Sequence, residues 1–324
     1  MDNLKYAFLG STNYSKELLL FLIESGLMPN IIFSIPENFN ISYSKKKVKN
    51  SNYVSLEVIA DKYEIDYYEI DSSNKKLNDY YDVIKELNLD LVLVLGWYYI
   101  IPRSIRKLAK YGAWGIHTSL LPKYAGGAPL SWAIINSEKE TGVTLFCMDD
   151  GIDDGDIIAQ KSFNIEYEDT IKEVYEKATI YSKEILNEAL SNIDNILFTP
   201  QDRSKIEVYP QRKPEDGEID WYKNSKNIYD FIRAQTLPYP CAFSSINNQT
   251  LKILDSKVID IKNDNFKKGE IVLVDKKTLV AVGDKYLELG MVDDGKKKYR
   301  FEDYARTQNL WGEVFGANSL KLGH

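Results

Sequence analysis

Cysteine and histidine are scarce in this sequence, and their scarcity excludes several kinds of site. The 324 residues include two cysteines, Cys147 and Cys241, and two histidines, His117 and His324. A zinc site of the Cys/His type needs about four ligands at short spacings, which this set cannot supply. Two cysteines so far apart do not form a disulfide framework, so we expect a reducing compartment. If the chemistry uses an imidazole, His117 is the candidate, because His324 is the last residue.

Long apolar runs and two common nucleotide-binding motifs are also missing. No apolar run reaches the roughly 18 residues of a membrane-spanning helix, and the N-terminus lacks the basic flank of a signal peptide. We therefore expect a cytoplasmic protein with no membrane partner. The absence of G-x-G-x-x-G after the first apolar run argues against a NAD enzyme, and the absence of G-x-x-x-x-G-K-[ST] argues against an NTPase. The net charge of -7 disfavours a nucleic-acid partner.

The first 200 residues alternate between strand-like and helix-like segments. Leu89–Trp97 is almost entirely apolar, which is typical of a central strand buried on both faces of a parallel sheet. Ser15–Gly26 and Thr170–Ile193 have the apolar spacing of helices between such strands. This alternation indicates βαβ units. The predicted fold class is α/β, with a Rossmann-like, mostly parallel sheet.

A second, smaller domain follows a polar stretch with three prolines, Thr199–Gly217. After the helical segment Ser225–Thr236, short β-like runs such as Thr250–Ile259 lie between turn signals. We place the boundary so that residues 1–204 form the α/β domain. Residues 205–324 then form a linker helix and a small β-rich, OB-like domain.

Chemistry-bearing residues concentrate between residues 114 and 157. His117 ends a predicted buried strand, and open α/β sheets bind ligands outside that end. A glycine-containing turn follows at Tyr124–Ala128, and the next predicted strand ends in an acidic loop that includes Asp150 and Asp153. A carboxylate beside an imidazole orients the ring and stabilises its charged form. The block therefore predicts a proton-transfer site.

At this block the sequence resembles the folate-dependent formyltransferases. The family pattern is Asn-x-His, then S-L-L-P, a glycine turn, E-T-G-V-T and D-x-G-D-I. The matching residues are His117, Ser119–Pro122, Gly126, Glu140–Thr144 and 153–157. The resemblance covers nearly the whole chain. It implies a formyltransferase domain with a β-rich appendage, N10-formyltetrahydrofolate as formyl donor, and no metal.

The resemblance also implies roles for particular residues. His117 would be the general acid/base and Asp153 its carboxylate partner, with Gly115 at the family's asparagine position. The residues expected to bind the folate are Trp97, Tyr98, Tyr99, Ile100, Ile101, Asp150 and Ile152. Those expected to bind the second substrate are Ser11, Thr12, Tyr124, Gly126, Gly127 and Pro129.

Gly115 departs from the family pattern. The family's asparagine amide helps to polarise the formyl oxygen, and losing one such donor costs roughly 10²- to 10³-fold in rate. Thr118, Ser119 and Tyr98 are candidate substitutes, and nothing in the sequence selects among them. A catalytically impaired folate- or nucleotide-binding homologue is therefore a third interpretation.

The acceptor amine is the remaining question. Pro129-Leu130-x-Trp132 and the Arg212–Gly217 segment with Trp221 are similar to nucleotide-sugar formyltransferases. These features place a nucleotide-linked amino sugar first. Methionyl-tRNA is the alternative, and the basic run Lys45–Lys49 favours it. The sequence leaves open the identity of the sugar and nucleotide, the role of the second domain, and whether the protein is a homodimer.

Overall fold

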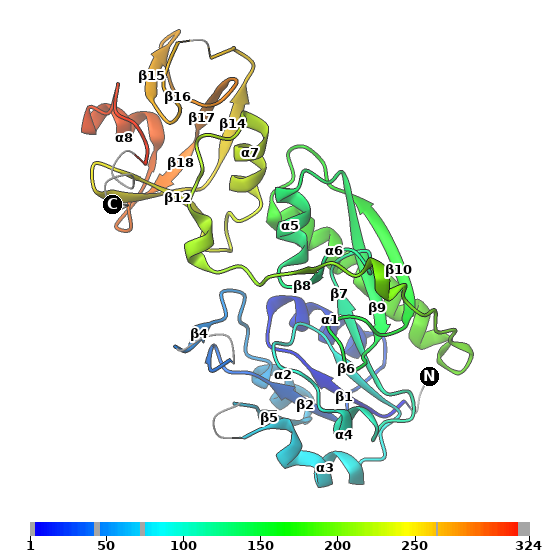
Figure 1. Cartoon of the computed structure of the whole chain (residues 1–324). Coiled ribbons are helices and arrows are strands. Elements are labelled where there is room, and N and C mark those ends of the chain that lie inside the picture. Colours follow the sequence, from blue (N-terminus) through cyan, green and yellow to red (C-terminus); the bar gives the residue numbers. More distant parts are fainter. Residues whose placement is uncertain (1–3, 42–45, 72–74, 264, 317–324) are drawn as a thin grey trace. The chain divides into compact units, whose positions relative to one another are not determined.

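The chain folds into two compact units. The computed structural model describes residues 4–41, 46–71, 75–263 and 265–316 (Figure 1). Unit 1 consists of Met1–Pro129, Glu140–Phe163 and Glu176–Pro210. Unit 2 consists of Leu130–Lys139, Asn164–Tyr175 and Gln211–His324. Two short segments from the middle of the chain thus belong to the unit that contains the C-terminal region.

Unit 1 is built on a seven-stranded sheet with the order β10-β9-β7-β6-β1-β2-β5. Strands β1, β2, β5, β6 and β7 are parallel, and β9 runs antiparallel to β7. The strands of this sheet are β1 (Tyr6–Leu9), β2 (Ile31–Ser34), β5 (Asp66–Glu69), β6 (Leu91–Val94), β7 (Ala113–His117), β9 (Glu140–Cys147) and β10 (Ile157–Asn164). Two small ribbons accompany it: β3 (Asn38–Phe39) with β4 (Val48–Lys49), and β8 (Ala125–Gly126) with β11 (Val208–Tyr209).

Burial on both faces explains the apolar composition of the central strands. All four residues of β6 are buried, as the sequence predicts for a strand covered on both sides. On one face, Leu9 and Val94 belong to a hydrophobic cluster with Ile84 and Ile105. Those two come from α3 (Tyr81–Glu86) and α4 (Arg103–Arg106).

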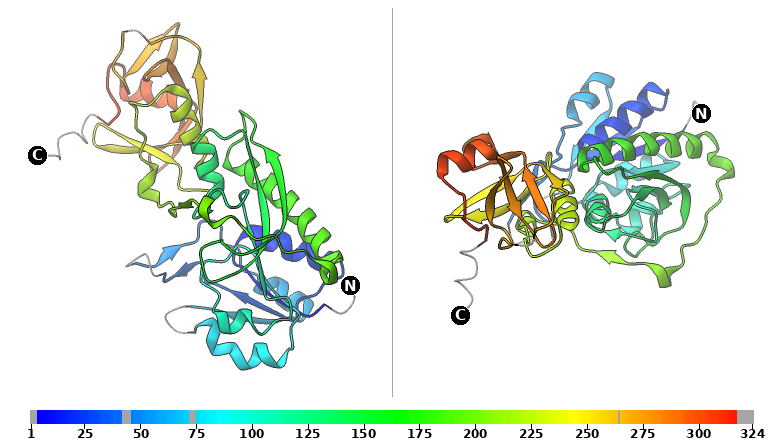
Figure 2. Two further views of the ribbon diagram at one scale, coloured as in Figure 1. Left: turned by 45° about the vertical axis from the view of Figure 1, so that its right-hand side comes forward. Right: turned by 90° about the horizontal axis from the view of Figure 1, so that it is seen from above.

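Helix α1 (Asn13–Glu24) begins where its sequence provides a cap. The Thr12 side chain accepts from the Ser15 backbone amide, and Ser15 reciprocates in a capping box. The helix lies beside α6 (Ile171–Ser191), to which Tyr14 is joined by a 2.7 Å hydrogen bond to Ser182 (Figure 2). The other helical elements of both units are α2 (Glu57–Tyr63), α5 (Pro129–Ile135), α7 (Ser225–Arg233), α8 (Phe301–Gln308) and the 3₁₀ turns Leu77–Tyr80, Ile193–Asn195, Arg203–Lys205 and Pro214–Gly217.

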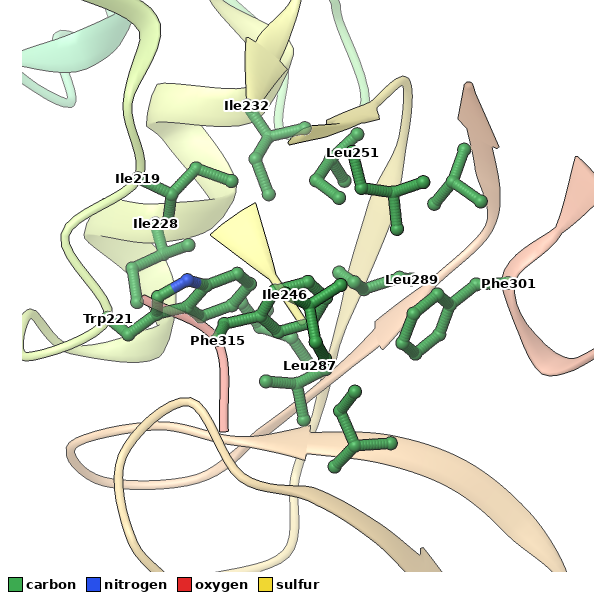
Figure 3. Packing of buried hydrophobic residues seen from close by; sticks show 14 of the residues in the cluster. Ile219, Trp221, Ile228, Ile232, Ile246, Leu251, Leu287, Leu289, Phe301 and Phe315 are labelled. Atoms are coloured by element: carbon green, nitrogen blue, oxygen red, sulfur yellow. The ribbon is translucent and has the colours of Figure 1, made fainter. Parts of the chain in front are cut away.

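Unit 2 contains two four-stranded sheets whose paired strands are antiparallel. The first has the order β12-β13-β18-β19 and the second the order β14-β17-β16-β15. Their core is formed by apolar residues that include Ile246, Leu251, Leu287 and the stacked pair Trp221 and Phe315 (Figure 3). The strands are β12 (Ala242–Ile246), β13 (Gln249–Ile253), β14 (Ser256–Ile259), β15 (Ile271–Val274), β16 (Lys277–Ala281), β17 (Tyr286–Leu289), β18 (Met291–Asp293) and β19 (Lys298–Arg300). The predicted class, a mostly parallel α/β sheet followed by a β-rich domain, is confirmed.

One predicted β run differs in detail. Thr250–Ile259 divides into β13 and β14, because the chain passes from one sheet to the other between them. At this crossing the Asp255 carboxylate accepts from the Met291 backbone amide at 2.9 Å. A change of sheet depends on which strand is the neighbour, and the hydrophobic pattern of a single strand does not report that.

A buried carboxylate joins three parts of unit 2. Asp230 on α7 is fully buried and accepts from Ser137 Oγ at 2.6 Å and from Arg233 Nε at 2.8 Å. Arg233 also donates to the backbone carbonyls of Glu166 and Asp169. The pair therefore fastens Leu130–Lys139 and Asn164–Tyr175, which precede the C-terminal region in sequence, to α7.

Candidate active site

The carboxyl ends of three neighbouring parallel strands bring the predicted site residues to one edge of the sheet. Ser11 lies just beyond β1, Trp97 beyond β6, and His117 is the last residue of β7. Because β1, β6 and β7 are adjacent and parallel, these positions meet at the same edge. That edge is where open α/β sheets place their ligands.

The His117 ring lies between two acceptors. Its Nε2 is 2.7 Å from the backbone oxygen of Tyr124, and its Nδ1 is 3.5 Å from Oδ2 of Asp153. The side chain is 10% exposed, so both contacts are largely shielded from water. A carbonyl oxygen only accepts, and therefore Nε2 carries a proton in this arrangement. A protonated ring would donate in both directions.

Both acceptors belong to residues with left-handed backbone. Tyr124 has φ 57° and Asp153 has φ 50°, a region that few residues other than glycine adopt. Such conformations persist only where the surrounding structure enforces them, and they cluster at functional sites. The backbone is thus shaped to present one carbonyl and one carboxylate to the same imidazole.

The Asp153 side chain and backbone are both held in place. Its Oδ2 accepts from the Gly126 backbone amide at 2.8 Å. Its carbonyl accepts from Nε2 of the buried Gln201 at 2.8 Å, and the same Nε2 is 2.7 Å from the carbonyl of Gly155. Sequence reasoning missed Gln201, because a glutamine in a polar, proline-containing stretch carries no motif.

Gly155 is required by close backbone contact. A β-carbon at this position would lie 1.8 Å from the Cys147 carbonyl oxygen. That oxygen belongs to the backbone, so it cannot swing aside. The D-x-G-D spacing therefore reflects packing of the acidic loop against β9.

Gly115 lies two residues before His117, on the same face of β7. A β-carbon there would be 2.6 Å from Cε of Met148 and 3.3 Å from Cε1 of Phe146. The space into which an asparagine would project is occupied by a thioether. Methionine sulfur is a weak acceptor with no donor, so Met148 cannot polarise a carbonyl oxygen as an amide does.

Two of the three candidate substitutes for that amide are engaged elsewhere. The Ser119 hydroxyl donates to the Lys123 carbonyl at 2.7 Å, and the Tyr98 hydroxyl donates to Asn50 Oδ1 at 3.0 Å. Thr118 directly follows His117 and is half-buried. Two of the three candidate hydroxyl donors therefore already hydrogen-bond to other groups of the protein.

The residues expected to bind the folate border an apolar pocket. Three of them line it, and the full lining is Ile70, Lys76, Leu77, Asn78, Trp97, Tyr99, Ile100 and Pro102. Within the described part of the chain, the buried Nε1 of Trp97 has no hydrogen-bond partner. Ile100 is 92% exposed and Ile152 is 59% exposed. An orphaned donor and two exposed apolar side chains fit a flat, partly polar ligand at this edge.

Asp150 is paired with arginine. Its carboxylate contacts the guanidinium of Arg106, and this hydrogen bond lowers the pKa of Asp150 below its usual value. Nearby, burial raises the pKa of the Cys147 thiol. A thiol held protonated is a poor nucleophile, so Cys147 is unsuited to covalent catalysis.

The residues expected to bind the second substrate fall into two groups. Ser11 and Thr12 lie at the start of α1, where Thr12 is the helix cap and Ser11 is fully buried. Tyr124 and Gly126 touch the His117–Asp153 pair directly. Gly127 donates to the Tyr209 carbonyl at 2.8 Å, and Pro129 begins α5. Of the residues expected to bind the second substrate, Tyr124 and Gly126 therefore lie at the histidine, whereas Ser11 and Thr12 lie at the start of α1.

The described residues hold neither a metal-binding cluster nor a membrane-spanning helix. Across residues 4–41, 46–71, 75–263 and 265–316, no group of three or more His, Cys, Asp or Glu side chains is arranged to hold a metal ion. In the same ranges, no helix is both long and apolar enough to cross a membrane.

A histidine–aspartate pair at the carboxyl edge of an α/β sheet marks the candidate active site, and similarity to known proteins gives the enzyme class and family. Residues 4–190 match the formyl transferase family and residues 212–309 match the formyl transferase C-terminal domain. The chain therefore belongs to the formyl transferase family and is a formyl-transferring enzyme. The methionyl-tRNA formyltransferase of Staphylococcus epidermidis is 32% identical over 319 residues, which cover 96% of this chain and 99% of that protein.

Solved structures share the fold at lower identity. The N-formyltransferase from Helicobacter canadensis, solved with folinic acid and dTDP-3-aminofucose, has a TM-score of 0.63 at 23% identity, covering 92% of this chain and 100% of that one. HypX from Aquifex aeolicus, solved with tetrahydrofolic acid, has a TM-score of 0.63 at 19% identity. The match covers 93% of this chain and 46% of HypX, so the chain spans about half the length of that protein.

Proposed function

We propose that this enzyme transfers a formyl group from N10-formyltetrahydrofolate to the amino group of methionyl-tRNA. The observation that supports methionyl-tRNA as the acceptor is the 32% identity to a methionyl-tRNA formyltransferase. That identity extends across 96% of the chain and so includes most of unit 2. Identity of that extent covers both the catalytic unit and the β-rich unit. The sugar enzyme from Helicobacter canadensis is 23% identical, and that likeness supports the fold alone.

This reverses the order that the sequence patterns favour, and the structure offers a reason. Arg212 and Trp132, which suggest a sugar enzyme, contact each other: the guanidinium carbon lies 4.9 Å from the Trp132 ring centroid. Trp221 is buried in the core of unit 2 and donates to Ser244 Oγ at 2.9 Å. Packing within unit 2 accounts for these residues without a nucleotide sugar.

The proposed chemistry at His117 is proton handling during acyl transfer. When bound, the donor supplies a formyl carbon; the amine nitrogen bonds to this carbon, the bond to N10 breaks, and the amine's proton ends on N10. His117 holds that proton on its ring between the two steps. Asp153 fixes the ring through Nδ1, and the Gly126 amide fixes Asp153.

The chain's residues also fit the folate. The orphaned Trp97 Nε1 provides a donor, and the pocket beside it provides apolar walls. We assign Trp97–Ile101, Asp150 and Ile152 to the donor site. We assign Tyr124 and Gly126 to the space beside the reacting carbon.

A basic hairpin supports an RNA acceptor. Lys46, Lys47 and Lys49 are exposed at the β3–β4 ribbon, and Lys49 lies 3.2 Å from Glu37. Exposed lysines gain affinity for phosphates by releasing counterions. An enzyme for a free nucleotide sugar has less need of an exposed lysine cluster.

The decisive experiment compares acceptors with one donor. The protein is incubated with N10-formyltetrahydrofolate and either methionyl-tRNA or a panel of dTDP-, UDP- and GDP-linked amino sugars, and formylated product is measured. We expect turnover on methionyl-tRNA at least 100-fold above any sugar. Turnover on a sugar with none on the tRNA would reverse the assignment of the acceptor. No turnover on either, with retained folate binding, would support the impaired homologue that Gly115 suggests.

A further inference from the structure

Arg106 is a largely buried arginine that joins two loops assigned to the formyl donor. It ends α4, and its side chain is 11% exposed. Nε donates to the Ile101 carbonyl at 3.2 Å, and Nη1 donates to the Met148 carbonyl at 3.0 Å. Nη2 contacts the Asp150 carboxylate, and Nη1 lies 3.8 Å from Asp149. One guanidinium thus contacts Trp97–Ile101 and the acidic loop at the same time.

Only an arginine can make this set of contacts. Its planar group carries five N–H donors in a fixed fork, so it can serve carbonyls and a carboxylate in different directions together. A lysine has one ammonium on a flexible stem and would contact either the Ile101 carbonyl or the acidic loop, but not both at once. The neighbouring Arg103 is 67% exposed and lies 3.6 Å from Asp150, as an ordinary surface ion pair does.

We infer that Arg106 is a positioning residue that sets the spacing between the two loops of the formyl-donor site. This inference rests on the proposed function of those loops. Each loop presents one exposed apolar side chain, Ile100 on the first and Ile152 on the second. Two loops that each contact one part of a flat ligand bind it more tightly when the distance between the loops is fixed before the ligand binds. Arg106 fixes it through the protein backbone, without touching the ligand.

The test separates donor binding from acceptor binding and from stability. In Arg106→Met we expect the KM for N10-formyltetrahydrofolate to rise at least tenfold, while the KM for the acceptor changes less than threefold. Hydrogen exchange of the ligand-free protein, measured by mass spectrometry, should accelerate at least tenfold in both 97–101 and 148–153. Arg103→Met is the matched control, and we expect it to leave both readouts within twofold of the wild type.

Arg106→Lys is a second variant that tests the same inference if Arg106→Met does not fold. We expect this variant to protect one segment but not the other and to raise the donor KM by severalfold. Wild-type behaviour of the lysine variant in both readouts would overturn the inference. So would equal increases in donor and acceptor KM, because a merely structural arginine would damage both. A wild-type protein that binds folate but formylates nothing would instead count against the proposed function.

Discussion

A β-carbon on Gly115 would lie 2.6 Å from the Cε atom of Met148, so the methionine fills the space that a side chain at position 115 would need. The two residues come from different elements, Gly115 from β7 and Met148 from the segment after β9. A side chain at position 115 can therefore be accommodated only if the Met148 side chain moves.

This coupling predicts that Gly115→Asn alone is harmful. The new side chain must displace Met148, and overpacking costs about 1–3 kcal/mol of unfolding free energy. We expect slower turnover and a lower melting temperature. In Gly115→Asn/Met148→Ala the space is restored, so the double variant should lose less stability than the two single variants lose together. Additive effects in this double-mutant cycle would show that the residues are independent.

His117→Asn should reduce kcat by about 10²- to 10⁴-fold, because a general acid/base at this position contributes on that scale. The folate contacts assigned to Trp97–Ile101 lie in a separate loop, so donor affinity should stay within about threefold. Single-turnover kinetics and folate binding measured by calorimetry check the two quantities. A variant with near-normal kcat would remove His117 from the chemistry.

Gln201 does not touch His117, but we expect its replacement to lower activity. Its amide donates to the carbonyls of Asp153 and Gly155. Gln201→Ala should lower kcat about tenfold and stability by about 1–2 kcal/mol, because the buried Gly155 carbonyl and the partly buried Asp153 carbonyl lose their donor. Gln201→Glu should be worse than alanine, since it sets a carboxylate against two carbonyls. If the glutamate variant were the milder one, these hydrogen bonds would not position Asp153.

The β3–β4 lysines predict a salt-dependent effect on the acceptor. Lys46→Gln/Lys47→Gln should raise the KM for methionyl-tRNA and make its logarithmic salt dependence shallower by about one unit for each phosphate that a lysine no longer neutralises. The KM for N10-formyltetrahydrofolate should not change. Lys296→Gln/Lys297→Gln, which removes two exposed lysines of unit 2, is the charge-matched comparison. Equal effects of the two double variants would indicate general electrostatic attraction.

Asp230→Ala tests the anchor of unit 2. It removes the carboxylate that accepts from Ser137 and Arg233 and leaves a buried guanidinium without its charged partner. Breaking a buried pair in this way costs about 3–5 kcal/mol. Urea unfolding should show this loss, whereas Glu215→Ala, at an exposed position of unit 2, should stay within about 0.5 kcal/mol. A similar stability for both variants would contradict the anchoring role.

Local patterns in the sequence determined much of this protein. The apolar run of β6 is explained by burial on both faces, and the cap of α1 by Thr12 and Ser15. Fixed motif spacings place His117 and Asp153 in one block, and the structure brings their side chains to 3.5 Å. Such features depend on neighbours within a few residues along the chain, so one sequence is enough to reveal them.

Tertiary structure alone decided how the site is supported. Gln201 is 48 positions from Asp153, Arg106 is 42 positions from Met148, and Met148 is 33 positions from Gly115. Each of these contacts depends on how separate elements pack, and no periodicity or turn signal encodes them. From the sequence alone, Gly115 is interpreted as the loss of an asparagine amide. In the fold it is a position where an added β-carbon would lie 2.6 Å from the end of Met148, so a side chain there requires the methionine to move.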